Sequence, residues 1–574
     1  MQRRVFNNTI FIVFLLLLAF SLRILDAGNW SVRFDEALSV WEAQMGFLEM
    51  TEFTARDVHP PLYFWILHIW LRLVGSSEFA VRSLSIFCGT LSTLTIYSLT
   101  WQLSKSKIAA ILAMLLVTLS PFHIHWSQDA RMYALTMFCA GIAVYAHWRG
   151  WNRMLALGGI GMVLSHYFGV IVVGVLILHR LFHYREHRRG NRPWIIAIAF
   201  ILVVIMVWGV YAIGLIRKDP GFATFDPAFT FQLMVTLFTF GEPNFLYSHF
   251  PYILVVTAIF FVGLALNWHE HRRATSLVVF GAALSPIFIA LLALPFVPVH
   301  VNSLQERHFA IFSPFVFTGY GIGFLALLRR RRLTWVGIIT CAGLLVLYTV
   351  LTAERRDEHY FKDDYRTMMA AVAALTDADD TVFYISGGRK PVIYYHLERV
   401  GYDVPKNAHA ELVNVKGIPR SSHQDVSATM EWIFAGIDRF WLIEIEAHLD
   451  EPLDAPLQWI KDNFFRIYHI PVAWNAISLY SSDETDSVAE IDTIVPPMIT
   501  EARPGDQVRI GVPAGATVDL VHSGQTVDSH SAETWMLHQF DIYPFYFNGI
   551  YELRVADRSY PFVITHSQDF PDGP

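Results

Sequence analysis

Long apolar runs separated by short polar and basic stretches fill residues 1–352 of the chain. A helix needs about 20 apolar residues to cross the hydrocarbon core of a bilayer. The pattern therefore predicts a polytopic α-helical membrane protein with about 11 transmembrane helices. The expected spans are 5–25, 79–103, 108–126, 131–148, 154–165, 168–183, 194–215, 251–268, 274–296, 309–328 and 333–352.

Clusters of basic residues lie in alternate loops between these spans and predict the orientation of the chain. Cytoplasmic loops carry an excess of Lys and Arg, so the N-terminus is expected in the cytoplasm. The stretch 154–183 can be one long helix or two short ones, and its basic flanks favour two, with Ser165-His166-Tyr167 at the outer turn. The clusters are Arg3-Arg4, Lys105 with Lys107, Arg149 with Arg153, Arg180 to Arg192, His271-Arg272-Arg273 and Arg329 to Arg332.

Two apolar segments are expected to lie at the outer surface of the membrane without crossing it. Residues 34–48 form an amphipathic pattern, with apolar side chains on one helical face and acidic ones elsewhere. Such a helix lies in the interface plane. Residues 62–74 span only 13 positions and are interrupted by His68 and Arg72, so the same location is expected for them.

In this topology, the polar clusters of residues 1–352 lie on the outer side of the membrane, and so does the tail that follows residue 352. Polar groups near a membrane are costly unless they are buried in protein or line a wet cavity. Their convergence therefore predicts a site on this face. The clusters are Asp35-Glu36, His59-Pro60-Pro61, Gln128 to Arg131, Ser165 to Tyr167, a loop over 216–250 and Glu306-Arg307-His308.

Residues 353–482 lack long apolar runs and are expected to lie in water outside the membrane. Helical and strand patterns alternate along them, which predicts a small α/β module. The expected helices are Asp364–Leu375 and Lys390–Leu397, and the expected strands are Thr381–Ile385 and Phe440–Glu446.

Residues 483–574 begin with a polar linker and continue with short alternating strands. Gln507–Val512 and Thr517–Val521 are two of these strands, and Pro-Gly and Ser-Gly pairs mark the turns. This pattern is typical of a β-sandwich, and an immunoglobulin-like type is expected over 495–568. We find no catalytic motif in this module or in the α/β module.

Composition supports the division into a membrane part and a water-exposed tail. Of 574 residues, 54% are apolar and 16% are charged, whereas a soluble globular chain carries about a quarter charged residues. From Glu354 onward, the chain has 17 Lys and Arg residues but 35 Asp and Glu residues. The basic residues of the membrane part fall in short clusters between apolar runs, which is no footprint for nucleic acid. The three cysteines all lie in apolar runs and indicate no disulfide framework.

Three short motifs carry a resemblance to a known family. They are Arg33-Phe34-Asp35-Glu36-Ala37, His59-Pro60-Pro61-Leu62-Tyr63 and Ser127-Gln128-Asp129-Ala130-Arg131-Met132-Tyr133. In order and spacing, the set resembles the GT-C superfamily of glycosyltransferases. More narrowly, it resembles the protein O-mannosyltransferase-like and lipid A aminoarabinose transferase-like bacterial enzymes. The resemblance covers about residues 1–352, and the terminal β module is not part of it.

This resemblance implies inverting transfer of a hexose or pentose from a polyprenyl-phosphate donor, with an acidic residue of the first outer loop as the catalytic base. Asp35 is the expected base, and Glu36 is expected to orient the loops or to accept a second hydrogen bond. The alternative is that both carboxylates merely start a helix at its dipole-favoured end.

The departing phosphate needs cations or hydrogen-bond donors. Arg131 and Arg307 are the expected phosphate ligands, because a guanidinium forms bidentate bonds with phosphate oxygens and stays charged in apolar surroundings. Tyr133 and His308 are expected to add donors, although relatives commonly carry tyrosine at the position of His308. For Arg131, the alternative is a side chain that reaches the lipid headgroups from a helix end.

His59 precedes two prolines that fix an extended backbone. When protonated, it is expected to contact the donor phosphate, as a lysine does in some relatives. The alternatives are a purely structural histidine and a divalent metal site shared with His166. We find no HExxH or DxD-like metal pattern, so a metal ion is only a possible cofactor.

The partners implied by this interpretation are the polyprenyl-phosphate sugar donor, an envelope lipid, glycan or protein as acceptor, and the lipid bilayer. The expected location is a bacterial plasma membrane, with the tail on the outer side. Three other functions fit a polytopic chain: a lipid or polysaccharide transporter, a non-catalytic envelope scaffold, and a polymerase or ligase that uses lipid-diphosphate sugars. A transporter would be expected to show inverted repeats and broken helices with intramembrane charges, and we find no such halves.

Overall fold

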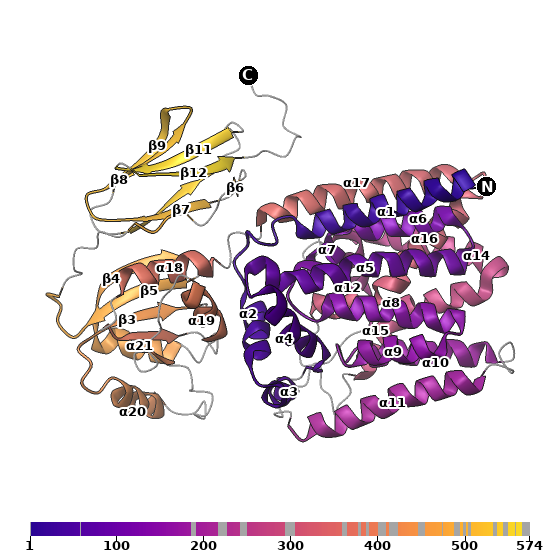
Figure 1. The fold of residues 1–574 in the computed structure, drawn as a ribbon, viewed down its shortest axis with the longest axis horizontal. Coiled ribbons are helices and arrows are strands. Elements are labelled where there is room, and N and C mark those ends of the chain that lie inside the picture. The colour runs from indigo at the N-terminus through magenta and orange to yellow at the C-terminus, as the bar shows by residue number, and fades with distance from the viewer. Residues whose placement is uncertain are drawn as a thin grey trace. The chain divides into compact units, whose positions relative to one another are not determined.

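Two compact units make up the chain (Figure 1). The membrane unit comprises Met1–Gly28 and Glu42–Glu354, and the tail unit comprises Asn29–Trp41 and Arg355–Pro574. The computed structural model describes residues 2–57, 59–184, 191–215, 227–241, 250–292, 305–358, 364–376, 380–385, 390–399, 409–411, 423–445, 454–472, 475–486, 494–497, 501–502, 507–531, 536–542, 549–556 and 558–564.

The membrane unit is helical throughout its described residues, and Figure 1 shows its long helices running side by side. Their bounds agree with most of the spans expected from hydropathy. The helices are α1 (Gln2–Ile24), α3 (Phe47–Arg56), α4 (Leu62–Val74), α5 (Glu78–Ser104), α6 (Lys107–Leu119), α7 (Pro121–Gln128), α8 (Tyr133–Arg149), α9 (Asn152–Val163), α10 (Gly169–Phe182), α11 (Asn191–Ile213), α12 (Pro227–Phe240), α14 (Phe250–Ala283), α15 (Ser285–Leu292), the 3-10 helix η2 (Glu306–Phe312), α16 (Ser313–Leu328) and α17 (Thr334–Glu358).

Five of the described helical stretches are long and apolar enough to cross a membrane. They are Glu78–Ser104, Asn191–Ile213, Tyr252–His269, Glu306–Leu328 and Thr334–Ala353, and the bent pair of α6 and α7 makes a sixth if counted as one span. The predicted number of eleven crossings therefore stays a prediction. Shorter apolar helices account for part of the difference.

The helices of the membrane unit differ in how much apolar surface they leave uncovered. The stretch formed by η2 and α16 is almost wholly buried within the unit, whereas most of α11 is not. Met206 and Val210 of α11, for example, are exposed. Exposure of so much apolar helix surface to water would be unfavourable, so these outer faces are suited to contact with lipid.

The structure corrects one expectation for the membrane unit. The segment 216–250, expected to be an outer loop, contains helix α12, in which Leu237 and Phe238 are buried. With 14 residues, α12 is shorter than the stretch that marks a crossing helix. Residues 216–226 and 242–249 of the same segment lie outside the described residues. The expected spans 251–268 and 274–296 begin in one helix, α14, which is kinked at His271.

The tail unit begins, in chain order, with α2 (Phe34–Gln44), the amphipathic helix expected from the sequence. The α/β module follows after residue 363, with its helices and strands close to the expected bounds. Its sheet has the order β2-β1-β3-β5-β4, with β1 parallel to β2 and β3, and β5 antiparallel to β3 and β4. The elements are α18 (Tyr365–Leu375), β1 (Val382–Ile385), α19 (Lys390–Arg399), β2 (His409–Glu411), α20 (His423–Ile433), β3 (Arg439–Glu444), α21 (Asp454–Asn463), β4 (Phe465–Val472) and β5 (Asn475–Ser481).

The terminal module consists of two sheets that share one apolar core. Strands β7 and β10 form one sheet, and the other has the order β6-β12-β11-β8-β9. Val508, Leu520, Phe540 and Leu553, one from each of four strands, are buried together in the core. The strands are β6 (Glu501–Ala502), β7 (Gln507–Val512), β8 (Thr517–His522), β9 (Gln525–Ser531), β10 (Met536–Asp541), β11 (Gly549–Val555) and β12 (Arg558–Ile564).

Candidate active site

Arg131 lies in the short turn between α7 and α8, and local sequence features place it there. Ser120 caps α7 by accepting a hydrogen bond from the backbone N–H of His123, and Pro121 occupies the first turn, as is common at helix starts. The resulting break bends α6 and α7 by 58°. The hydroxyl of Ser85, on α5, donates to the Arg131 carbonyl at 3.2 Å and so ties the turn to a long helix.

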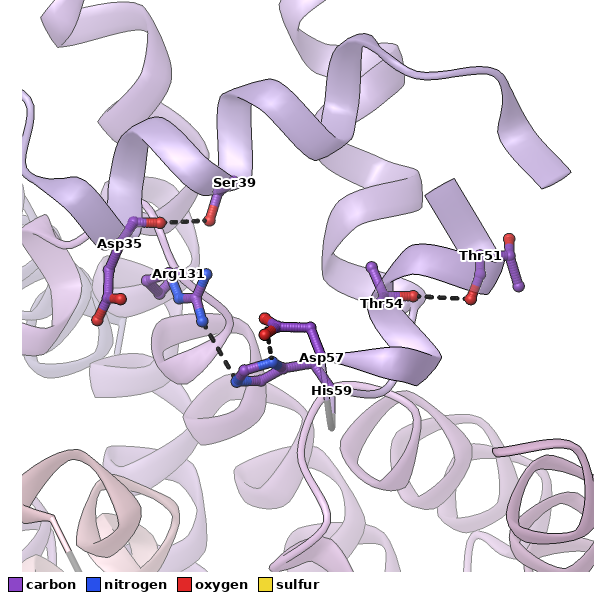
Figure 2. Close-up of polar contacts among 7 residues, drawn as sticks. All are labelled: Asp35, Ser39, Thr51, Thr54, Asp57, His59 and Arg131. Atoms are coloured by element: carbon purple, nitrogen blue, oxygen red, sulfur yellow. Dashed lines mark hydrogen bonds and ion pairs between the residues drawn. The ribbon is translucent and has the colours of Figure 1, made fainter. Parts of the chain in front are cut away.

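The Arg131 side chain is buried in the membrane unit, with 2% of its surface exposed. Its guanidinium lies over the Phe64 ring, 5.8 Å from the centroid, and its Nη2 is 3.2 Å from His59 Nε2. His59 Nδ1 is in turn 3.1 Å from the Asp57 carboxylate. Figure 2 shows His59 between Arg131 and Asp57. The three side chains form one chain of polar contacts.

The donor and acceptor roles in the contacts Arg131–His59–Asp57 follow from the chemistry of the two end residues. A guanidinium can only donate, so His59 Nε2 accepts from Arg131. His59 Nδ1 therefore carries the hydrogen and donates to Asp57. The backbone N–H of His59 donates to the Thr54 carbonyl near the end of α3, which ties His59 to that helix. Asp57 was not among the residues singled out from the sequence, and its only signal is its place two residues before His59.

A group of aromatic and histidine rings continues the site in the membrane unit. The His166 ring lies 5.9 Å from the Tyr133 ring and 5.5 Å from the His308 ring, measured between centroids. The Phe168 ring packs at 5.0 Å from His308. These residues come from α8, the turn between α9 and α10, and η2. The structure thus brings together Tyr133, His166 and His308, whose positions in the sequence are far apart.

Electrostatics connect this ring group with the arginines. Burial lowers the pKa of His166 well below its ordinary value, and the nearby charges of His308, His59, Arg307 and Arg131 lower that pKa further. His166 is therefore neutral at physiological pH, and its Nδ1 accepts the backbone N–H of Phe168. Four residues expected to bind phosphate thus lower the pKa of His166, namely His59, Arg131, Arg307 and His308. The fifth, Tyr133, packs against the His166 ring.

The alternative of a metal site at His59 and His166 finds no further ligands in the residues that the structure describes. Among them, no group of three or more His, Cys, Asp and Glu side chains is placed to hold a metal ion. Zinc and similar ions are bound by three or four such ligands in proteins. The site combines the buried Arg131 guanidinium with histidine and aromatic rings.

Asp35 and Glu36 lie in the first turn of α2, in the tail unit, and have different surroundings. Glu36 is buried, and its carboxylate accepts the backbone N–H of Arg33 at 3.1 Å. This is the contact by which an acidic residue in a first turn closes a helix start. Asp35 is half-buried, and its carbonyl accepts from the Ser39 hydroxyl (Figure 2). Glu36 therefore contributes to the start of α2.

The segment that carries Asp35 is attached to the α/β module. His396 of α19 is fully buried, and its Nε2 lies 2.9 Å from the Val32 carbonyl and 3.2 Å from the Ser31 hydroxyl. Tyr394 of the same helix meets Trp41 edge to face, with ring centroids 5.8 Å apart. These contacts explain why Asn29–Trp41 clusters with the tail.

An apolar pocket of about 350 Å³ also lies in the membrane unit, between α12, α14 and α16. Its lining includes Met234, Phe238, Phe260, Val316 and Tyr320. The pocket therefore offers an aromatic and aliphatic surface inside the unit that carries Arg131.

Comparison with known proteins gives the relationships of this chain. Residues 58–211 match the family model described as dolichyl-phosphate-mannose-protein mannosyltransferase. A curated relative, undecaprenyl phosphate-alpha-4-amino-4-deoxy-L-arabinose arabinosyl transferase 1 from Sodalis glossinidius, is 26% identical over 178 residues. That alignment covers 28% of this chain and 30% of the relative, so it spans under a third of the relative's length.

Solved structures show the fold over a longer stretch. ArnT from Cupriavidus metallidurans in the apo state matches with a TM-score of 0.53 at 12% identity, covering 84% of this chain and 99% of that chain. The same protein bound to undecaprenyl phosphate matches with a TM-score of 0.50 at 11% identity, over 84% of this chain and 100% of that one. The family match over residues 58–211 and the fold shared with the ArnT structures agree with the resemblance to the GT-C superfamily of glycosyltransferases that the sequence motifs carry.

Proposed function

We propose that this protein transfers a sugar from a polyprenyl-phosphate donor to an acceptor of the cell envelope, at the outer face of a bacterial plasma membrane. The observation that carries the proposal is the buried Arg131 in contact with His59, two residues that both lie in the segment that matches the family model. A buried guanidinium beside histidines suits the phosphate of a lipid donor. The curated relative is named as an undecaprenyl phosphate-aminoarabinose arabinosyl transferase, and one ArnT structure was solved with bound undecaprenyl phosphate, which supports this donor class.

The proposed reaction needs four groups in defined roles. Asp35 accepts the proton of the acceptor hydroxyl as that oxygen attacks the anomeric carbon. The bond from the anomeric carbon to the phosphate oxygen breaks, and the sugar changes configuration. Arg131 and Arg307 stabilise the negative charge that remains on polyprenyl phosphate, and the position of His59 beside Arg131 supports a role for it in binding the same phosphate. The apolar pocket supplies a surface suited to isoprene units.

Substitution of the proposed base tests this function. Membranes that contain the wild-type protein are incubated with radiolabelled polyprenyl-phosphate hexose or pentose and envelope extract, and labelled product is measured. Asp35→Asn is expected to lower transfer by at least about a hundredfold, because general-base catalysis contributes roughly 10²–10⁴ in rate. The matched control is Glu49→Gln, which removes an exposed carboxylate from α3 and should leave transfer unchanged.

Equal transfer by wild type and Asp35→Asn, at equal protein levels, would remove Asp35 from its proposed role. Absence of transfer with every tested donor, while the label stays on its lipid, would instead favour a transporter or scaffold over an enzyme.

A further inference from the structure

The segment that carries the proposed base is attached at both of its ends to one helix of the α/β module. Val32 lies three residues before Asp35, is fully buried, and offers its carbonyl to His396 Nε2 at 2.9 Å. A carbonyl can only accept, so Nε2 carries the hydrogen and donates it. Trp41, six residues after Asp35, packs against Tyr394. Asp35 therefore lies between two points of attachment to α19.

Local hydrogen bonds make this segment stiff between the two attachments. The Arg33 backbone N–H donates to the Glu36 carboxylate, and the Arg33 carbonyl accepts the Ala37 N–H at 2.8 Å. Ser39 then binds the carbonyl of Asp35. Because the first turn of α2 is closed in this way, a displacement of Val32 is transmitted to Asp35 as a shift or rotation of the whole turn. The position of the carboxylate is thus tied to α19.

We propose that His396 is a positioning residue for Asp35, so that the α/β module is a working part of the enzyme and not an appendage. The inference rests on the proposed function, in which Asp35 is the base. A displacement of about 1 Å of a catalytic group can cost on the order of a hundredfold in rate. His396 is therefore expected to affect the chemical step and not donor binding.

The test compares two substitutions of His396 in the full-length protein. His396→Leu removes the donor to Val32, and it is expected to lower kcat by about tenfold or more while the KM for the lipid donor stays within about twofold. His396→Gln places an amide N–H near the position of Nε2, and it is expected to restore kcat to near the wild-type value. A KM increase without a kcat loss, or wild-type kcat in His396→Leu, would overturn the proposal.

A second buried substitution separates positioning from general loss of stability. Leu442 is fully buried in β3, in a core cluster of the module that does not include the segment Asn29–Trp41. Leu442→Ala should destabilise the module by leaving a cavity in its core, yet kcat of the folded protein should stay near wild type. An equal kcat loss in Leu442→Ala would overturn the positioning role. If His396→Leu fails to accumulate, Trp41→Leu decides the matter from the other attachment, with the same expected kcat loss.

Asp35→Asn is measured in parallel, so that the two proposals fail in different ways. Full transfer by Asp35→Asn would reject the base assignment and, with it, the reason for a positioning residue. Loss of transfer in Asp35→Asn together with unchanged kcat in His396→Leu would reject only the role of His396.

Discussion

Arg131 carries a positive charge in a place that water hardly reaches, and that position has an energetic consequence. Burial of a charge is costly unless hydrogen bonds and opposite charge compensate it. An arginine does not lose its proton to escape this cost. In the structure, His59 supplies a neutral acceptor and Phe64 supplies a ring face. A phosphate anion can form charge-assisted, bidentate hydrogen bonds with a guanidinium, so the phosphate of the donor is expected to bind at Arg131.

Substitution of this residue should weaken binding of the lipid donor. Arg131→Gln removes the charge and the forked donor group, and the affinity for polyprenyl phosphate is expected to fall by about tenfold to a hundredfold, as charge-assisted hydrogen bonds contribute about 1.5–3 kcal/mol. Binding of a fluorescent polyprenyl phosphate to the detergent-solubilised protein measures the effect. Arg149→Gln, at the other end of α8, is the control and should bind like wild type. An unchanged Kd in Arg131→Gln would contradict the phosphate role.

Single residues were predictable from the sequence where a motif marks them. Arg131 and His59 stand in two of the three motifs, and the structure places their side chains in contact. Asp57 was missed, because a carboxylate two positions from a histidine is common and only the loop conformation turns it towards Nδ1. The different surroundings of Asp35 and Glu36 were equally hidden, since neighbouring carboxylates look alike until the helix start is known.

At the scale of elements, close approach of backbones holds the centre of the membrane unit together. Helices α14 and α16 pack with Gly263 against Gly323, where a Cβ added to Gly263 would lie 2.6 Å from the Cα of Gly323. A Cβ added to Gly323 would have 3.6 Å to its nearest neighbour, the Phe260 carbonyl oxygen. Small residues of this kind let membrane helices approach closely. The contact is asymmetric, so the two glycines are not equivalent.

This asymmetry predicts opposite results for two matched substitutions. Gly263→Ala should destabilise the protein by about 1–3 kcal/mol, because the helices must move apart to admit the methyl group. Gly323→Ala fits without displacement and gains helix propensity, so it should be neutral or slightly stabilising. Thermal unfolding of the purified protein in detergent measures both. Equal Tm values for the two variants would show that the helices are not in this contact.

Elements with clear end signals were predictable, and ambiguous ones were not. Helix α18 begins where Asp364 indicates, and the Asp364 carboxylate accepts the Thr367 N–H as an N-cap. Helix α12 was missed because a 14-residue apolar stretch fits neither a crossing helix nor a polar loop. Strands β4 and β5 also escaped notice, although β5 is buried along its whole length. A short, fully buried strand has no alternation by which to identify it.

At the scale of the whole chain, the division into units could be drawn from composition only in outline. The acidic bias after Glu354 and the apolar bias before it predict a boundary near residue 352, and the membrane unit of the structure ends at Glu354. The segment Asn29–Trp41 escapes such reasoning, because its partner His396 lies more than 350 positions later and no local pattern records that contact. Attachments between distant segments are tertiary information, which explains why the positioning role of α19 emerged only from the structure.

The orientation of the chain in the membrane is the last property that the sequence predicts and an experiment can decide. The native cysteines Cys88, Cys139 and Cys341 are buried, so background labelling by a membrane-impermeant maleimide should be low. Glu484→Cys places a thiol on the exposed surface of the tail, and Lys105→Cys places one at the exposed turn between α5 and α6. The basic residues near Lys105 predict a cytoplasmic turn, whereas the tail is expected outside. In intact spheroplasts the maleimide should therefore label Glu484→Cys and leave Lys105→Cys unlabelled, with the reverse in inverted vesicles. Labelling of both variants in inverted vesicles, and of neither in spheroplasts, would place the tail in the cytosol with the basic loops. Asp35, which belongs to the same unit as the tail, would then lie on the opposite side of the membrane from any donor on the outer leaflet.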